Sequence, residues 1–286
     1  MSLIESALAR ARGRSGGSET GAAAVSARIP GAAPRPGQVA PAAPPTERLV
    51  APYVPVDAKA CDEHRVLLDQ TAVRNHDAVA AYRILRTRIL HRARARGWTT
   101  IGITSAGPND GKSLTALNLA LSLAPERNSE VVLLDLDMRN PSVCRCLGVE
   151  PPSGMLDYLE RRVSPRELFF SVGIDNLSIA SGNTATDQAS ELLGTTQFEE
   201  LVHYVKQHTA NPIILIDLPP LLSTDDALVI APRVDAMLLV VAEGITDRSA
   251  LSKAVELLSE FPMAGLVLNR AVEAQAHGYG YGIGKG

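Results

Sequence analysis

The sequence predicts an α/β fold, a doubly wound parallel sheet with helices on both faces. Short runs of apolar and β-branched residues alternate along the chain with longer segments whose apolar residues recur at helical spacing, and this alternation is typical of a parallel sheet. A composition of 45% apolar residues in 286 allows one substantial core. A glycine-containing loop lies between one predicted strand and the next helix. We therefore expect one folded domain, residues 49–272.

The predicted elements follow from these periodicities. The strands are expected at Thr99–Thr104, Val131–Leu136, Leu177–Ala180, Ile213–Asp217, Ala236–Val241 and Ala264–Leu268. The helices are expected at Ala78–Arg96, Ser113–Leu123, Met155–Leu159, Arg166–Val172, Ala189–His208 and Asp247–Phe261. Gly194 predicts a break within the fifth of these helices.

Both ends of the chain differ in composition from the domain. Residues 13–48 are rich in Ala, Pro and Gly and carry almost no large apolar side chain, so we expect a disordered linker. Residues 1–12 place Leu3, Ile4 and Leu8 at helical spacing, which predicts a short helix. Docking of that helix on a partner and a frayed terminus are both open interpretations. Residues 273–286 are rich in Gly and contain two Tyr, so we expect a flexible tail.

Composition also excludes several classes of protein. The net charge of −3 and the pI of about 6.1 offer no global basic field, so we expect no nucleic-acid partner. The pair Cys144 and Cys146 has no second Cys or His pair at ligand spacing, which argues against zinc, and three cysteines favour a reducing compartment. No apolar run reaches the length of a membrane span. We therefore expect a cytoplasmic protein.

The most informative motif is the loop from Ala106 to Ser113, which matches a Walker A phosphate loop except that Ala106 replaces the first Gly. Glycines let backbone amides turn toward phosphate oxygens, and the following helix adds the positive end of its dipole. Lys112 is expected to reach the outer phosphates, and Ser113 to bind Mg²⁺. The predicted nucleotide-binding residues are Gly107, Pro108, Asn109, Asp110, Gly111, Lys112, Ser113 and Leu114.

Acidic residues end two of the predicted strands. Asp135 and Asp137 are two residues apart at the end of the second strand, and we expect them to point to the same side because strand side chains alternate. Asp217 ends the fourth strand. Ligands bind at the carboxyl edge of a parallel sheet, so these carboxylates should converge on the phosphate loop. Ser113, Asp137 and Asp217 therefore predict a site for Mg²⁺, and together with the phosphate loop they predict a site for ATP.

At these motifs the chain resembles the bacterial tyrosine kinases of capsular and exopolysaccharide synthesis, the BY-kinases. The resemblance runs from Ala78 to Arg270 and includes Asp135-x-Asp137-x-Arg139-x-Pro141 and Asp217-x-Pro219-Pro220. It implies a P-loop NTPase fold of the MinD/ParA-like type. Partitioning ATPases of that type carry a signature lysine where this chain has Gly107, which argues against a partitioning role.

The resemblance also implies an activity and partners. Residues 1–5 and 81–87 look like the stand-alone, exosortase-associated branch, whose separate partner is a membrane chain-length determinant, or polysaccharide co-polymerase. Any membrane contact would then be made through that partner. A homo-oligomer is implied, although Ala80 stands where the oligomerisation motif has Glu before Arg83 and Arg86. The same helix continues as a dense run of arginines, for which a solvated face and a contact surface are both open interpretations.

The resemblance assigns roles to individual residues. It makes Asn269 an adenine contact, with a strand-end turn as the alternative, and it makes the tail tyrosines Tyr279 and Tyr281 phosphoacceptors. Lys112 and Mg²⁺ would neutralise charge, and Asp135 would accept the hydroxyl proton, with the roles of Asp135 and Asp137 exchangeable. The hypothesis is an ATP-dependent tyrosine autokinase that regulates exopolysaccharide synthesis or export. The alternative is a regulatory ATPase of the export machinery without kinase activity.

Overall fold

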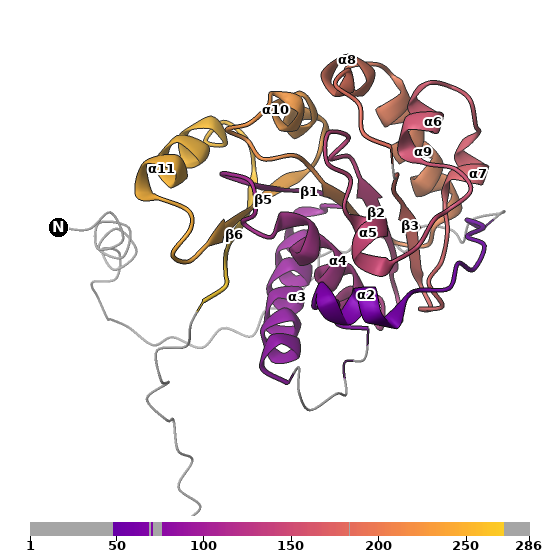
Figure 1. Ribbon diagram of the computed structural model, residues 1–286, viewed down its shortest axis with the longest axis horizontal. Helices are drawn as coiled ribbons and strands as arrows, with labels where there is room; N and C mark the ends of the chain where they lie inside the picture. The colour runs from indigo at the N-terminus through magenta and orange to yellow at the C-terminus, as the bar shows by residue number, and fades with distance from the viewer. Residues whose placement is uncertain (1–47, 69, 71–75, 183, 272–286) are drawn as a thin grey trace, which may run out of the picture. The chain divides into compact units, whose positions relative to one another are not determined.

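The computed structural model describes residues 48–68, 70, 76–182 and 184–271 (Figure 1). The predicted helix at residues 1–12, nearly all of the predicted linker 13–48, and the tail 273–286 with Tyr279 and Tyr281 lie outside the described residues. These three predictions therefore stay predictions.

The described part is built on one six-stranded sheet in the order β3-β2-β4-β1-β5-β6. Every pair of neighbouring strands is parallel. The strands are β1 Thr100–Ser105, β2 Glu130–Asp135, β3 Leu177–Ala180, β4 Pro212–Asp217, β5 Ala236–Ala242 and β6 Met263–Asn269. The chain reverses its direction of winding beside β1, which leaves the phosphate loop near the middle of the carboxyl edge. The predicted fold class is confirmed.

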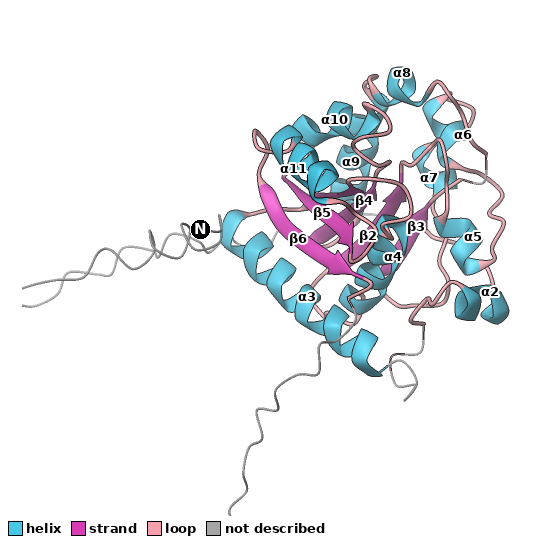
Figure 2. Ribbon diagram, turned by 60° about the vertical axis from the view of Figure 1, so that its left-hand side comes forward, coloured by secondary structure: helices cyan, strands magenta, loops and turns pink. Residues whose placement is uncertain are grey.

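Helices cover both faces of the sheet (Figure 2). The helices are α2 Ala58–Glu63, α3 His76–Arg96, α4 Lys112–Leu123, α5 Val143–Leu147, α6 Met155–Leu159, α7 Pro165–Leu168, α8 Ala189–Leu193, α9 Gln197–His208, α10 Asp226–Ile230, the 3-10 helix η2 Ala231–Arg233, and α11 Arg248–Leu257. Helices α3, α4 and α5 pack on one face, and α9, α10 and α11 pack on the other.

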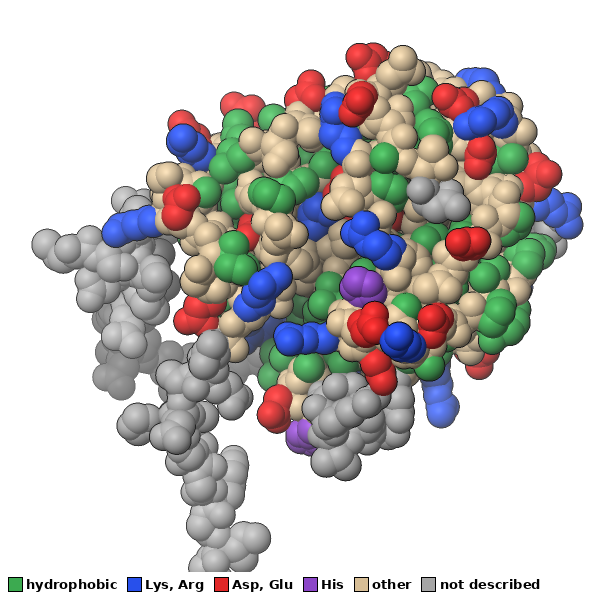
Figure 3. Space-filling view, in the orientation of Figure 1, with side chains coloured by type: hydrophobic (Ala, Val, Ile, Leu, Met, Phe, Trp, Pro, Cys, Tyr) green, Lys and Arg blue, Asp and Glu red, His purple; other side chains and the backbone are tan. Residues whose placement is uncertain are grey.

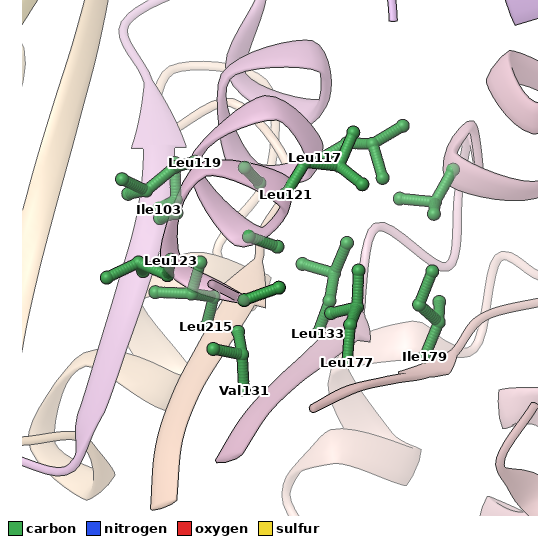
Figure 4. Packing of buried hydrophobic residues seen from close by; sticks show 14 of the residues in the cluster. Ile103, Leu117, Leu119, Leu121, Leu123, Val131, Leu133, Leu177, Ile179 and Leu215 are labelled. Atoms are coloured by element: carbon green, nitrogen blue, oxygen red, sulfur yellow. The ribbon is translucent and has the colours of Figure 1, made fainter. Parts of the chain in front are cut away.

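Alternation along the strands supplies each face with its own core. In β2, Leu133 contributes to one core and Leu134 to the other, and both are fully buried. Helix α4 sends Leu117, Leu121 and Leu123 into the first core, where they lie over the strands (Figure 4). A strand buried on both faces must be apolar at every position, which explains the continuous apolar runs in the sequence.

Several predicted bounds differ from the structure. The helix predicted at Arg166–Val172 is wrong beyond Leu168, because Phe169 has an extended backbone and Phe170 pairs with Ile179. Asp137 lies in the loop after β2, which ends at Asp135. The predicted strand end at Leu136 is therefore one residue too late, and a turn rather than strand alternation carries Asp137 to Lys112.

No helix in the described ranges combines the length and apolar character needed to cross a bilayer. Charged side chains of both signs are interspersed on the face drawn in Figure 3. In the arginine-rich helix α3, Arg86 and Arg94 each approach Glu126, with N···O distances of 3.7 and 3.6 Å. Arg96 lies over the ring of Trp98, 5.4 Å from its centroid. Part of the basic run is therefore used inside the chain.

Candidate active site at the phosphate loop

The phosphate loop joins β1 to α4, as its sequence predicts, and α4 begins at Lys112. Gly111 precedes the helix with φ of 91°, a left-handed conformation that favours glycine. A Cβ added at Gly111 would lie 2.1 Å from Nδ2 of Asn269, so a larger residue is excluded by both strain and space. The first amides of α4 have no partner within the helix, since the first turn of any helix leaves its N–H groups free. These amides are available for an anion.

Lys112 lies among the predicted carboxylates and is almost fully buried. Its Nζ is 2.6 Å from Oδ2 of Asp137 and 3.6 Å from Oδ1 of Asp217, and it donates a hydrogen bond to Ser113 Oγ over 2.9 Å. Burial lowers the pKa of Lys112, but Asp217, Asp137 and Asp135 raise it by more, so the net pKa is raised and the ammonium stays charged. The structure thus brings together the cation and the two acidic segments that the sequence predicts.

Asp135 is held by a full set of hydrogen bonds. Its Oδ2 accepts from the amides of Ser142 and Val143, both at 3.1 Å, and from the hydroxyl of Ser181 at 2.9 Å. Its Oδ1 accepts from the amide of Asp137 at 3.2 Å. Burial raises the pKa of Asp135, while the hydrogen bonds and Lys112 lower it in part. These bonds fix the turn that carries Asp137 toward Lys112.

Asp217 differs from Asp135 because neither of its oxygens has a hydrogen-bond partner among the described residues. It ends β4, pairs in register with Asp135, and is fully buried. Burial raises the pKa of Asp217 to about 7, partly offset by the charge of Lys112 and by the nearby Ser113 hydroxyl. The buried carboxylate is thus balanced mainly by the Lys112 ammonium 3.6 Å away, and a bound metal ion would add to that balance.

The donor set around Asp217 fits Mg²⁺. Oxygen ligands from one or two carboxylates and a hydroxyl, completed by water and phosphate oxygens, are what Mg²⁺ prefers. The described residues contain no group of three or more His, Cys, Asp and Glu side chains arranged to enclose a metal. The side chains that would hold it are those of Ser113, Asp217 and Asp137.

Replacing Asp217 with Asn is expected to weaken the Mg²⁺ dependence of nucleotide binding about tenfold or more, because an amide is a poor ligand for a hard cation. The raised pKa adds a pH dependence. Protons compete with Mg²⁺ below about pH 7, so wild-type affinity for Mg²⁺ should rise from pH 6 to pH 8 by more than that of the variant, which keeps only the rise due to the ADP phosphate itself. Mg²⁺ titrations with ADP present measure both effects. Asp175→Asn, an exposed carboxylate at the opposite edge of the sheet, is the control. An unchanged titration for Asp217→Asn would remove this residue from the metal site.

The other predicted site residues lie around the loop in different ways. Asn269 ends β6 and donates from Nδ2 to the carbonyl oxygen of Asp110 over 2.8 Å, so in this structure it braces the loop. Leu114 packs its side chain against the core, which leaves its backbone for ligand contact. The adenine contact of Asn269 stays a prediction.

Some residues at the site have no signal in the sequence. Asp226, which is buried, accepts a hydrogen bond over 2.9 Å from Nε of Arg139, a residue of the motif that contains Asp135 and Asp137. The two residues are 87 positions apart in the sequence. Ser181 binds Asp135 and Thr246 binds Asp110. Each partner is a common residue in an unremarkable segment, so only the tertiary structure identifies it. A separate cavity of about 300 Å³ lies at the amino edge of the sheet, and none of the predicted site residues lines it.

Comparison with known proteins identifies the family of the chain. Residues 99–277 match the family model described as ParA, NUBPL iron-transfer P-loop NTPase. The chain is 29% identical over 202 residues to the tyrosine-protein kinase YwqD of Bacillus subtilis, covering 70% of this chain and 84% of that protein. It is 29% identical over 207 residues to the putative tyrosine-protein kinase AmsA of Erwinia amylovora, covering 71% of this chain but 28% of that protein.

Among solved structures, the kinase domain of VpsO superposes with a TM-score of 0.60 at 25% identity, covering 70% of this chain and 100% of that domain. The resemblance to bacterial tyrosine kinases is thereby confirmed, and these relatives favour the kinase hypothesis over the regulatory ATPase. The family match, together with the parallel sheet and the phosphate loop, indicates common descent with these proteins and not only a shared fold. The chain belongs to the ParA family of P-loop NTPases, and its relatives within that family are bacterial tyrosine-protein kinases.

Proposed function

We propose that this chain is an ATP-dependent protein-tyrosine kinase that phosphorylates Tyr279 and Tyr281 in the tail of another subunit and thereby regulates exopolysaccharide synthesis or export. The observation that carries the proposal is the buried group of Lys112, Asp137 and Asp217 beside the free amides of α4. This group combines a cation that can bind phosphate, carboxylates that can bind Mg²⁺, and a carboxylate that can accept the proton of the attacking tyrosine. Phosphoryl transfer needs little more than such positioning and charge neutralisation.

In the proposed reaction the phenolic oxygen of a tail tyrosine forms a bond to the γ-phosphorus as the bond to the ADP oxygen breaks. Lys112 and the amides of α4 bind the phosphate oxygens, and Ser113 and Asp217 would hold the metal. When bound, Mg²⁺ supplies Lewis-acid neutralisation of the phosphate charge. The phenolic proton passes to the carboxylate of Asp135 or Asp137.

The hydrogen bonds favour one of the two exchangeable assignments for that carboxylate. Both oxygens of Asp135 already accept bonds that fix the turn, so Asp135 suits a positioning role. Asp137 accepts an amide bond from Asn140 on Oδ1, and its Oδ2 contacts only the movable ammonium of Lys112 among the described residues. We therefore assign positioning to Asp135 and proton acceptance to Asp137, which in this assignment leaves Ser113 and Asp217 as the metal ligands.

The proposal extends to cell location and partners. We infer a cytoplasmic kinase that assembles as a homo-oligomer and meets the membrane through a chain-length determinant protein, by analogy with kinases that act in polysaccharide systems. The exposed Arg83 and Arg88 of α3 offer a surface for such assembly, whereas Arg92 donates to the carbonyl oxygen of Ala264 within the chain.

The proposal is tested by incubating the purified chain with γ-labelled ATP and Mg²⁺ and mapping phosphotyrosine by mass spectrometry. We expect label on Tyr279 and Tyr281. To test transfer between subunits, a Lys112→Met chain with an intact tail is mixed with a tail-mutated but otherwise active chain. Label on the Lys112→Met chain supports transfer in trans, whereas ATP hydrolysis with no phosphotyrosine would replace the kinase with a regulatory ATPase.

A further inference from the structure

The phosphate loop carries an acidic residue, Asp110, two positions before the first residue of α4. Asp110 is buried, with 1% of its surface exposed. A carboxylate at this point would be attracted to the free amides and the positive dipole of the helix, as in an ordinary helix cap. An Asp110 that bound these amides would occupy the donors that a phosphate needs. The structure shows the carboxylate bound elsewhere.

Two contacts hold Asp110 away from those amides. Its Oδ2 accepts from the amide of Gly107 over 3.0 Å, which closes the loop on itself. Its Oδ1 accepts from the hydroxyl of Thr246 over 2.8 Å. Thr246 comes from the turn between β5 and α11, 136 positions away in the sequence. The loop conformation therefore depends on a residue outside the loop.

The direction of the Thr246 hydroxyl follows from its second contact. Its Oγ1 accepts a hydrogen bond from the amide of Ala242 over 2.8 Å, and an amide is always a donor. The hydroxyl hydrogen is thus free to point at Asp110. The Thr246 amide also donates to the carbonyl oxygen of Ala242 over 3.0 Å, so the residue is fixed on both sides before it reaches Asp110.

The backbone of the loop has a separate brace. Asn269 donates to the carbonyl oxygen of Asp110, and Arg270 donates to that of Asn109 over 3.0 Å. These bonds hold the chain but leave the carboxylate free to rotate. Orientation of the carboxylate is left to Gly107 and Thr246.

We propose that Thr246 is a positioning residue that keeps the Asp110 carboxylate off the amides at the start of α4, so that these amides stay available for phosphate. The proposal rests on the proposed nucleotide-binding function. Without the hydroxyl, one oxygen of a buried carboxylate loses its donor. The first amides of α4, which begins two residues later at Lys112, are donors that the helix leaves unpaired. The carboxylate then competes with the nucleotide for them.

The test measures binding of the non-hydrolysable analogue AMP-PNP with Mg²⁺ by isothermal titration calorimetry on the full chain. Thr246→Val removes the hydroxyl at nearly constant shape, and we expect its dissociation constant to rise about tenfold. Thr246→Ser keeps the hydroxyl and should bind within about twofold of wild type. The melting temperature of Thr246→Val without nucleotide should fall modestly, because the Ala242 amide loses its acceptor, so the affinity and not the stability is the deciding measurement.

A double-mutant cycle isolates the competing carboxylate. In an Asp110→Ala background, Thr246→Val should change the dissociation constant by less than about twofold, since no carboxylate is left to compete. A lowered melting temperature with unchanged affinity in Thr246→Val would show a merely structural role and overturn the proposal, as would an equal loss of affinity in both backgrounds. If Thr246→Val does not fold, Thr246→Ala is compared with Thr246→Ser in the same way. Failure of wild type to bind the analogue would instead overturn the proposed function, before any variant is compared.

Discussion

Replacing Lys112 with Met is expected to abolish ATP turnover, with a loss of about 100- to 1,000-fold or more, the range typical of removing one preorganised charge from an active site. Met matches the length of the Lys stem but carries no charge for the phosphates. The loop backbone should still form, because its braces come from Thr246, Asn269 and Arg270. Steady-state ATP hydrolysis and phosphotyrosine formation measure the loss.

The same substitution has a predictable effect on stability. Lys112 lowers the pKa values of Asp135 and Asp217, so its removal leaves these buried carboxyls with pKa values raised further. A carboxyl whose pKa is higher in the folded state than in the unfolded state makes the fold less stable as the pH rises toward that value. The variant should therefore melt at a lower temperature relative to wild type at pH 8 than at pH 5. Lys206→Met, an exposed lysine of α9, is the control for both measurements. Normal turnover in the Lys112 variant would refute the site.

Replacing both Tyr279 and Tyr281 with Phe is expected to remove most phosphotyrosine while ATP hydrolysis survives. Phe keeps the ring and deletes only the oxygen that attacks phosphorus, and that oxygen must come within about 3 to 3.5 Å of the phosphorus in line with the leaving group. Three other tyrosines are constrained by the fold. Tyr158 is buried, Tyr204 stacks on His208, and Tyr82 packs against the first core.

Tyr53 provides the matched control for the tail. It is 65% exposed although it lies in the folded domain, which the sequence alone did not indicate. Its backbone is tied to Ser171 by a bridge, so its ring is accessible to solvent but the chain around it is held in place. Tyr53→Phe should leave the phosphotyrosine signal within about twofold of wild type, since an accessible ring without a mobile chain cannot align with the phosphate. If this single change removes the signal and the tail variant does not, the phosphoacceptor is Tyr53.

The sequence alone determined those features that depend on residues close together in the chain. The strands were recognisable because their two buried faces require continuous apolar runs, and the phosphate loop because glycine, lysine and serine act there within a few positions. Asp217 could be placed from the same local logic, since the last residue of a parallel strand lies at the ligand-binding edge.

Only the tertiary structure decided three of the short helices and the long-range partners. Helices α2, α5 and α10 span five or six residues, too few to form on propensity alone, and they exist because buried residues such as Cys61, Cys146 and Ala227 pack into the cores. Asp226 and Thr246 reach Arg139 and Asp110 across 87 and 136 positions, and such pairings have no periodicity in the chain. They arise where strand order brings distant loops to the same edge of the sheet, which is why the residues that orient this site could be found only in the fold.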